Sequence, residues 1–322
     1  MTARTPVTVI GGYLGAGKTT LVNHLLRNAG GRRLAILVND FGALPIDADL
    51  IEAQDDDLIS IAGGCVCCSF GSDLMGALMK LAEREPAPDH LLIETSGVAL
   101  PGSVARSVAL IARYSIDGVS VIVDSETVRA RAADPYMGDT ITRQLAEADL
   151  VIANKIDLIG PRALMELREW IGRAAPRARS VEATRGQVPV EVMFEIASDV
   201  ARPATGGLAS GAFASGAIRA PVDASARYDS ASFEVPGAID VARLAQALAE
   251  PACGLVRAKG MLRDLDGSMK TLHLVGARFE LTPFAGAGTS GLACIGLRGQ
   301  LDRAAIERAI GPANAAIFLK NP

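Results

Sequence analysis

The sequence predicts a doubly wound α/β domain followed by a smaller α+β domain. Three observations support this fold class. Uninterrupted apolar runs, typical of buried parallel strands, alternate with helical patterns across residues 1–200. Residues 201–227 are rich in small residues and indicate a flexible linker. Residues 228–322 return to strand-like runs with interspersed helical patterns, which indicates a second, smaller domain.

In the first domain we expect strands where an apolar, β-branched run is bounded by turn residues. These strands are residues 6–10, 34–38, 91–93, 119–123 and 150–153. Helices are expected between them, at residues 20–26, 72–84, 139–148 and 162–173. Ligands of such a fold bind at the carboxyl ends of the strands. Nearly all the recognisable motifs of this chain begin there.

The second domain is expected to follow a β-α-β-β-β-β-α order. Its strands are residues 228–235, 254–262, 270–275, 278–281 and 292–297. Its helices are residues 239–248 and 302–310. This order predicts one sheet with its helices on one face.

Composition narrows the class of protein. Hydrophobic residues make up 49% and charged residues 21%, which is enough for a packed core. The formal net charge of −4 does not favour a nucleic-acid or anionic-membrane partner. Apolar runs stay below the roughly 18 residues of a membrane-spanning helix, and residues 1–5 lack the apolar stretch of a signal peptide. We therefore expect a cytoplasmic protein whose five cysteines are mostly thiols.

The first expected strand runs into G-Y-L-G-A-G-K-T at residues 12–19, the G-x-x-x-x-G-K-[ST] pattern of a phosphate-binding loop. Glycines let successive backbone N–H groups point at an anion, and the N-terminus of the next helix adds partial positive charge. Lys18 can reach the β- and γ-phosphates, and the Thr19 hydroxyl can coordinate Mg²⁺. The alternative is a chance glycine-rich turn between a strand and a helix, which the preceding strand, Lys18 and Thr19 together disfavour. The residues expected to hold the phosphates are Gly15, Ala16, Gly17, Lys18, Thr19 and Thr20.

A base-reading sequence follows the strand at residues 150–153. It is Asn154-Lys155-Ile156-Asp157, of the form N-K-x-D. The Asp157 carboxylate can accept hydrogen bonds from N1–H and the exocyclic amine of guanine, a donor pattern that adenine lacks. The alternative is an ordinary strand-to-helix turn. After a phosphate loop and at a strand end, the pattern favours GTP over ATP.

Two acidic residues at strand ends are candidates for the magnesium and hydrolysis chemistry. Glu94 begins E-T-S-G at residues 94–97, where an acid can hold the magnesium shell or orient the attacking water. Gly97 offers a backbone N–H to the γ-phosphate. Asp40 follows the strand at residues 34–38 and could meet the metal directly or through water. Either acid could instead serve as a cap or turn residue.

Three thiols stand close together in G-G-C-V-C-C at residues 63–68. Cys65, Cys67 and Cys68 can converge on one soft cation, and zinc suits thiolate ligands. An open fourth position would favour transfer over permanent binding. Packing of buried thiols or a redox pair are the alternatives. Because Cys253 and Cys294 are scattered elsewhere, the cluster favours a transition-metal site.

These motifs, in this order and spacing, resemble the CobW family of P-loop GTPases, relatives of the urease and hydrogenase maturation GTPases. Residues 257–260 and 276–279 resemble the family's C-terminal domain, so the likeness extends over nearly the whole chain. The resemblance implies a GTPase that binds a transition metal, often zinc or cobalt, and delivers it to a client protein. The chain departs from the family pattern at Ala43, where an acid is common, and at Arg185, where a histidine is common. It also lacks a histidine-rich stretch.

The leading hypothesis is therefore a slow GTPase that uses Mg²⁺ and couples its nucleotide state to zinc at the cysteine loop. The opposing hypothesis is a GTP-binding assembly factor or metal sensor whose cysteines are structural. A kinase or synthetase would need an acceptor pocket, and the sequence indicates none. The expected partners are a guanine nucleotide and a client metalloprotein, without nucleic acid or membrane, and a homodimer is possible.

Overall fold

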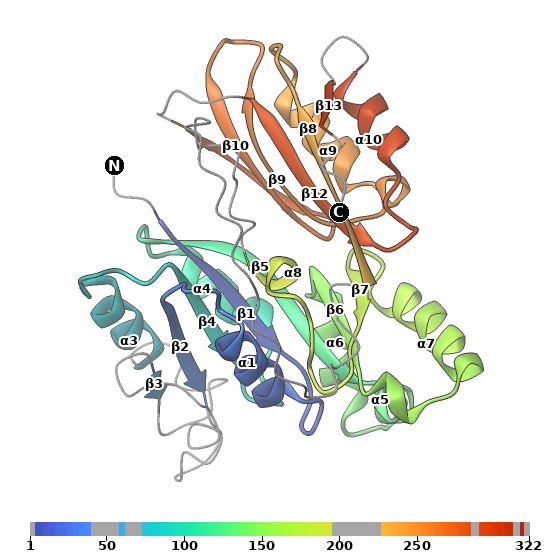
Figure 1. Ribbon diagram of the computed structural model, residues 1–322. Coiled ribbons are helices and arrows are strands. Elements are labelled where there is room, and N and C mark those ends of the chain that lie inside the picture. The colour runs from blue at the N-terminus through green and yellow to red at the C-terminus, as the bar shows by residue number, and fades with distance from the viewer. Residues whose placement is uncertain are drawn as a thin grey trace, which may run out of the picture. The chain divides into compact units, whose positions relative to one another are not determined.

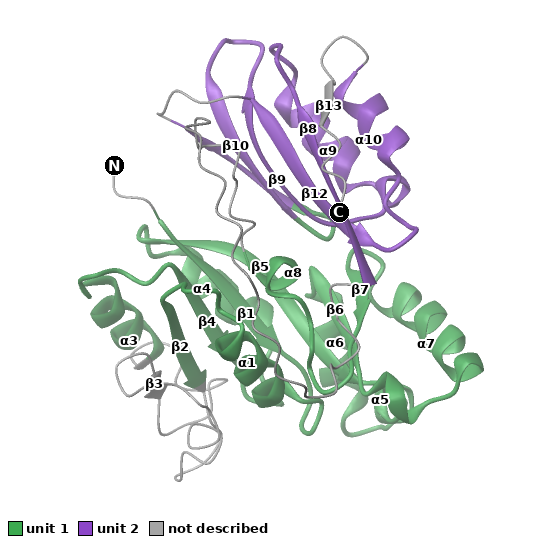
Figure 2. Cartoon of the chain, viewed as in Figure 1, with its two compact units in different colours: residues 1–195, 275–278 green, residues 196–274, 279–322 purple. Residues whose placement is uncertain are grey.

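The computed structural model describes residues 4–39, 58–61, 73–194, 227–284, 290–311 and 316–318. The chain divides into two compact units (Figure 2). The first unit contains Met1–Glu195 and Val275–Arg278, and the second contains Ile196–Leu274 and Phe279–Pro322. Of the expected linker at residues 201–227, only Arg227 lies within the described residues.

The first unit is built on a seven-stranded sheet in the order β3-β2-β4-β1-β5-β6-β7 (Figure 1). Every strand pair in it is parallel. The strands are β1 (Thr5–Gly11), β2 (Leu34–Asn39), β3 (Leu58–Ile61), β4 (His90–Glu94), β5 (Tyr114–Asp124), β6 (Leu150–Asn154) and β7 (Arg179–Glu182). The helices are α1 (Lys18–Arg27), α3 (Asp73–Ala82), α4 (Pro101–Ala109), α5 (Val128–Ala132), α6 (Gly138–Ala146), α7 (Pro161–Ala174), α8 (Val190–Met193) and the 3-10 turn η1 (Ile156–Leu158).

The sheet is covered on both faces. Alternate side chains of the central strands, such as Val9, Ile93 and Val121, pack into one apolar cluster with residues from α3, α4, α5, α6 and α7. Helix α1 lies across the opposite face (Figure 1), where its Leu21 and Leu25 side chains are fully buried. This doubly wound arrangement confirms the predicted fold class of the first domain.

The first unit differs from the prediction at several elements, among them the short helices α5 and α8, which were not predicted. The expected strand at residues 119–123 is the second half of β5, whose first half was hidden by polar residues. One of these, Asp117, is buried and accepts a hydrogen bond from the Thr8 hydroxyl across 3.3 Å. Strand β3 and helix α4 were not predicted. Helix α4 begins with Pro101 at its first position, which is a recognised start signal.

The second unit contains a six-stranded sheet in the order β11-β10-β9-β12-β8-β13. Its strands are β8 (Tyr228–Glu234), β9 (Leu255–Arg263), β10 (Met269–Val275), β11 (Arg278–Pro283), β12 (Gly291–Leu297) and β13 (Ala316–Phe318), and its helices are α9 (Val241–Ala249), the 3-10 turn η4 (Pro251–Cys253) and α10 (Arg303–Ile310). Strand β12 pairs antiparallel with β8 and β9. The predicted order of elements is confirmed, with β13 in addition.

Helices α9 and α10 cover one face of this second sheet (Figure 1), as expected. Each helix starts at an aspartate whose side chain accepts a backbone N–H: Asp240 from Arg243 and Asp302 from Ala305, both across 2.9 Å. The apolar faces of both helices and of the sheet form one cluster around Leu244, Leu272 and Ile306. Within the described parts of the chain, the helices are too short or too polar to cross a lipid bilayer.

Candidate nucleotide-binding site

The phosphate loop connects β1 to α1 and depends on its glycines. Gly12, Gly15 and Gly17 have φ angles of 137°, 76° and 105°, a region that other residues rarely adopt. A Cβ atom on Gly12 would lie 2.2 Å from the carbonyl oxygen of Ile122. A Cβ atom on Gly17 would lie 2.5 Å from Nδ2 of Asn154. Both glycines are therefore required for the loop to pass between its neighbours.

The loop borders a cavity of about 620 Å³. This volume is within the usual range of ligand pockets, about 300–1,000 Å³. The residues that line it are Leu14, Gly15, Gly17, Lys18, Thr19, Thr20, Asn154, Lys155, Asp157, Leu158 and Arg185. The two motifs predicted to bind phosphate and base, which are far apart in the sequence, therefore border the same cavity.

Asn154 joins the two motifs directly. Its Nδ2 donates to the carbonyl oxygen of Ala16 across 2.9 Å, and its Oδ1 accepts from the backbone N–H of Gly186 across 2.9 Å. The side chain is 1% exposed. Because both of its polar atoms are bonded and buried, Asn154 fixes the phosphate loop relative to the loop after β7.

Lys155, the residue after Asn154, also binds the phosphate loop. Its backbone has a left-handed φ of 62°, and its Nζ donates to the carbonyl oxygen of Gly15 across 2.8 Å. Nζ also pairs with Oδ2 of Asp124 across 2.7 Å. Burial alone would raise the pKa of Asp124, but the Lys155 ammonium and the backbone N–H of Glu126 outweigh burial and hold that pKa below its ordinary value.

Asp157 follows two residues later in η1, and its side chain is exposed at the cavity. Among the described residues, its carboxylate has neither a hydrogen bond nor an ion pair. Leu158 and Arg185 line the cavity with it. Arg185 has a left-handed φ of 52° in the loop after β7. The residues that line the cavity near Asp157 therefore offer three kinds of group: the two carboxylate oxygens of Asp157, the apolar side chain of Leu158 and the positive charge of Arg185.

The predicted magnesium and phosphate residues meet at the start of α1. The Thr19 hydroxyl donates to Oε1 of Glu94 across 3.1 Å, and Glu94 is 2% exposed. Nζ of Lys18 donates to the carbonyl oxygen of Gly12 across 3.1 Å. Hydroxyl and carboxylate oxygens are the hard donors that Mg²⁺ prefers, so the pair of Thr19 and Glu94 fits that ion.

The E-T-S-G segment that follows β4 contacts the phosphate loop. A Cβ atom on Gly97 would lie 2.5 Å from Cδ2 and 2.8 Å from the backbone nitrogen of Leu14, so the two backbones approach closely. Gln144 of α6 holds this segment from the other side. Its Nε2 donates to the carbonyl oxygens of Gly97 and Ala99, across 3.1 Å and 2.8 Å.

Four predicted site residues lie outside the described residues. These are Asp40, Cys65, Cys67 and Cys68. Within the ranges that the structure describes, there is no group of three or more His, Cys, Asp or Glu side chains that could hold a metal ion. His90 is buried, and its ring is bonded to the Thr8 hydroxyl across 2.8 Å.

Sequence reasoning missed several residues that line the cavity or contact the segments beside it. Asp124 ends β5 just as Glu94 ends β4 and Asn154 ends β6, so its place at a strand end was an available signal. Arg131 and Gln144 lie on helices and belong to no motif, and no sequence signal indicated them. Arg185 stood out only as a departure from the family pattern.

Comparison with known proteins agrees with this architecture. Residues 6–182 match the profile of the CobW/HypB/UreG nucleotide-binding domain, and residues 228–313 match the cobalamin synthesis protein cobW C-terminal domain. The zinc chaperone CobW of Sinorhizobium is 35% identical over 218 residues, which cover 59% of this chain and 62% of that protein. The zinc chaperone YjiA of Escherichia coli is 33% identical over 198 residues, which cover 58% of this chain and 60% of that protein. The matched region spans less than two thirds of each relative.

Among solved structures, Zn(II)-bound YjiA GTPase from E. coli is similar with a TM-score of 0.44 and 24% identity, over 96% of this chain and 98% of that one. The family profile alone matches more than half of the chain, from β1 to β7. The chain therefore belongs to the CobW/HypB/UreG family of nucleotide-binding domains.

Proposed function

We propose that this chain is a GTP-hydrolysing metallochaperone that binds zinc at Cys65, Cys67 and Cys68 and delivers it to a client protein. In this proposal residues 1–200 form the GTPase domain, residues 201–227 are the linker and residues 228–322 form the small domain. The chain would act in the cytoplasm. The observation that carries the nucleotide half is the double hydrogen bond of Asn154, because it keeps the base-reading segment and the phosphate loop on one cavity.

The exposed carboxylate of Asp157 supports guanine as the base. Two carboxylate oxygens can accept from N1–H and the exocyclic amine of guanine, whereas adenine presents an acceptor at N1. The neighbouring Lys155 is held by Asp124 and Gly15, so its aliphatic stem has a fixed place beside the same cavity. The arrangement therefore favours GTP over ATP.

Hydrolysis would use the residues at the start of α1 and the end of β4. Lys18 would exchange its bond to the Gly12 carbonyl for the β- and γ-phosphates. Thr19 and Glu94 would hold Mg²⁺, which neutralises charge on the phosphate oxygens when it is bound. Glu94 would also orient the attacking water, and Asp40 is the second acidic candidate. Since no arginine is assigned to the transition state, turnover would be slow without a partner.

The metal half of the proposal rests on the three cysteines and on the relatives. Three thiolates are soft ligands that suit zinc, and cobalt can occupy similar sites. The similar proteins of Sinorhizobium, Pseudomonas aeruginosa and E. coli are named zinc chaperones. Zinc is therefore the cargo that we propose for this chain.

The contact between Gly97 and Leu14 offers a route from nucleotide to metal. Gly97 packs directly against the phosphate loop, so a γ-phosphate that takes up its N–H would alter a tight contact. In the sequence, the cysteines lie between Asp40 and Glu94. GTP and Mg²⁺ would order the segments around these two acids, and this ordering would change the zinc affinity of the cysteines. Hydrolysis would return the zinc affinity to its earlier value.

Two measurements test the proposal. Competition for the site by GTP and ATP tests the nucleotide half, and equal competition would exclude the guanine assignment. Transfer of zinc to an apo-client, with GTP and with a non-hydrolysable analogue, tests delivery. Equal transfer with both would show that delivery does not need GTP hydrolysis. The absence of transfer with either would favour the other candidate, a GTP-binding assembly factor or metal sensor with structural cysteines and no metal transfer.

A further inference from the structure

Three consecutive carbonyl oxygens of the phosphate loop are held by side chains from outside the loop. The oxygen of Leu14 accepts from Nη1 of Arg131 across 2.8 Å. The oxygen of Gly15 accepts from Nζ of Lys155 across 2.8 Å. The oxygen of Ala16 accepts from Nδ2 of Asn154 across 2.9 Å.

This row of bonds determines where the N–H groups of the loop point. In a planar trans peptide the C=O of one residue and the N–H of the next point in opposite directions. Because Arg131 binds the carbonyl oxygen of Leu14, the N–H of Gly15 points away from Arg131. In the same way, the N–H of Gly17 points away from Asn154, which binds the carbonyl oxygen of Ala16. The N–H of Ala16 closes the turn on the carbonyl oxygen of Tyr13 across 3.2 Å. The side chains that bind the loop's carbonyl oxygens therefore determine the direction of the N–H groups that would bind an anion.

Arg131 differs from the other two holders. Lys155 and Asn154 belong to the N-K-x-D segment and line the cavity, whereas Arg131 belongs to no motif and does not line it. It reaches the loop from α5, 117 positions along the chain from Leu14. Its guanidinium carbon also lies 5.7 Å from the centre of the Tyr13 ring. A planar guanidinium can stack on a ring while it donates to a carbonyl, whereas a lysine ammonium has no planar face to stack.

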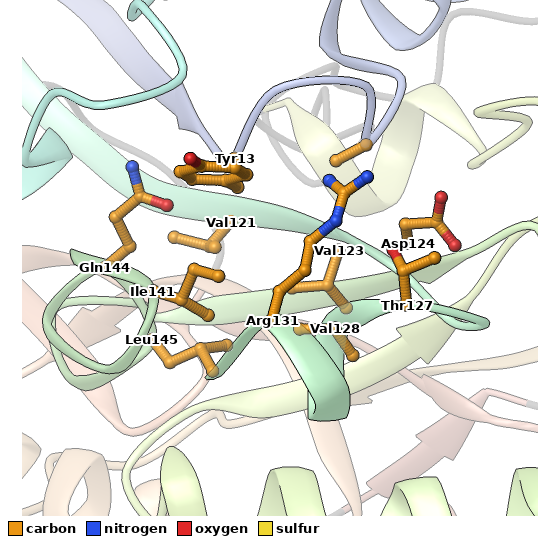
Figure 3. A pocket seen from close by; sticks show the side chains of 11 residues that line it. Tyr13, Val121, Val123, Asp124, Thr127, Val128, Arg131, Ile141, Gln144 and Leu145 are labelled. Atoms are coloured by element: carbon orange, nitrogen blue, oxygen red, sulfur yellow. The ribbon is translucent and has the colours of Figure 1, made fainter. Parts of the chain in front are cut away.

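The packing beneath this part of the loop supports a role for the polar contact. Figure 3 shows Tyr13 and Arg131 beside a small pocket with apolar side chains such as Val121, Ile141 and Leu145. The pocket encloses about 10 Å³, close to the space of one water molecule. Apolar packing under Tyr13 is therefore incomplete, and the hydrogen bond from Arg131 supplies a fixed link between α5 and the loop.

We propose that Arg131 is a positioning residue of the phosphate site, which aligns the loop for the nucleotide's phosphates without touching them. This inference rests on the proposed function, because it assumes that the cavity binds GTP. It separates two properties of the site. Phosphate affinity should depend on Arg131, whereas the choice of guanine over adenine should depend on Asp157 and not on Arg131.

The test compares Arg131→Ala and Arg131→Lys with a matched control, Arg129→Ala. Arg129 lies on the same helix and pairs with Glu166 of α7 across 3.1 Å rather than with the loop. The affinities of GTP, GDP and inorganic tripolyphosphate are measured by displacement of a fluorescent GTP analogue. The melting temperature of each nucleotide-free variant reports its folding. Tripolyphosphate is included because it has no base and probes the loop alone.

We expect Arg131→Ala to weaken all three ligands by about tenfold, the size expected for a hydrogen bond to a charged donor. The ratio of GTP to ATP affinity, with ATP measured by the same displacement, should not change. Arg131→Lys should restore part of the loss, and Arg129→Ala should match the wild-type chain. If Arg131→Ala lowers the melting temperature strongly, its affinities are set aside. The tripolyphosphate affinity of Arg131→Lys then tests the role of Arg131.

Two results would overturn the inference, and they are distinguishable. Wild-type-like tripolyphosphate binding by the folded Arg131 variants would reject the role of Arg131 and leave the proposed function intact. Failure of the wild-type chain to bind GTP would reject the proposed function and the inference together.

Discussion

The hydroxyl of Thr19 donates a hydrogen bond to Oε1 of Glu94 across 3.1 Å. This bond joins the first turn of α1 to the end of β4, next to β1 in the sheet, where Ile10 pairs with Glu94. Glu94 therefore stands at the carboxyl end of β4, and Thr19 lies in the helix that follows the carboxyl end of the neighbouring parallel strand β1. A hydroxyl and a carboxylate in this place are suited to share a magnesium ion with a bound triphosphate.

The first prediction concerns the charge of Glu94. Glu94→Gln keeps the shape of the side chain and an oxygen that can accept from Thr19, but it removes the negative charge. We expect GTP hydrolysis to fall by about a hundredfold or more, as for the loss of a group that orients water. GDP affinity without Mg²⁺ should change little, because the phosphate loop is intact. Single-turnover hydrolysis and GDP titrations check this, and full hydrolytic activity in Glu94→Gln would exclude Glu94 as the residue that orients the attacking water.

The second prediction concerns Asp157 and the base. Asp157→Ala should remove most of the preference for GTP over ATP, a discrimination of about 1–3 kcal/mol for a bidentate contact. Asp157→Asn replaces one acceptor oxygen with an amide donor, which complements xanthine better than guanine. Competition by GTP, ATP and xanthosine triphosphate checks both variants. An unchanged order of preference in both would mean that another group reads the base.

The third prediction concerns Lys18. Its side chain is 7% exposed and bonded to the Gly12 carbonyl, so it is already at the phosphate loop. Lys18→Ala should abolish measurable hydrolysis while the nucleotide-free fold remains. The wild-type chain alone should turn over slowly. Phosphate release assays check both statements, and rapid turnover without metal or client would contradict a switch.

The fourth prediction concerns the pH dependence of stability through His24 on α1. Nε2 of His24 lies 3.0 Å from the carbonyl oxygen of Val188, and Nδ1 lies 3.3 Å from Nδ2 of Asn28. A neutral ring that donates from Nε2 and accepts at Nδ1 satisfies both contacts. Burial lowers the pKa of His24 from 6.5, and the nearby Arg27 lowers it further, while the bond to Val188 opposes them.

Because the folded pKa of His24 is depressed, the unfolded chain binds more protons just below pH 6.5. The free energy of unfolding should therefore fall as the pH drops below that value, and level off once the folded histidine is also protonated. His24→Gln keeps a donor for Val188 and cannot titrate. Urea denaturation at several pH values should show a flatter profile for this variant, and an identical slope would assign the dependence to other groups.

Much of the first unit could be predicted because local rules agree with its fold. The apolar runs at residues 6–10, 34–38 and 150–153 each became a buried parallel strand. The motifs at Lys18 and Asn154 follow two of these strands, so their approach in space follows from the parallel sheet. Their contact was predictable without any knowledge of side-chain packing.

The remaining contacts depend on packing between distant segments. Arg131 reaches Leu14, and Gln144 reaches Gly97 and Ala99, only because α5 and α6 pack at the end of the sheet. The early half of β5 was missed because Asp117 is polar, yet it is buried beside Thr8 and His90. Local patterns cannot show that a polar residue will find its partner across the sheet.

The fifth prediction concerns the cysteine loop. Thiols must deprotonate to bind zinc, so zinc affinity should rise with pH and binding should release protons. The chain should bind one zinc ion tightly, and cobalt should give intense thiolate charge-transfer bands in the near ultraviolet. Changing Cys67 and Cys68 together to Ser should remove these bands and leave GTP binding nearly unchanged. Unchanged zinc affinity in the double variant would exclude the cysteine site.

One titration tests whether the nucleotide state controls metal binding. Zinc affinity is measured by competition with a chromophoric chelator, for the wild-type chain with Mg²⁺ and either GDP or a non-hydrolysable GTP analogue. Lys18→Ala, which should not respond to the γ-phosphate, is the control. We expect the zinc affinity of the wild-type chain to differ by about tenfold or more between the two nucleotides, a coupling of about 1.4 kcal/mol. Equal zinc affinity in both states would contradict it.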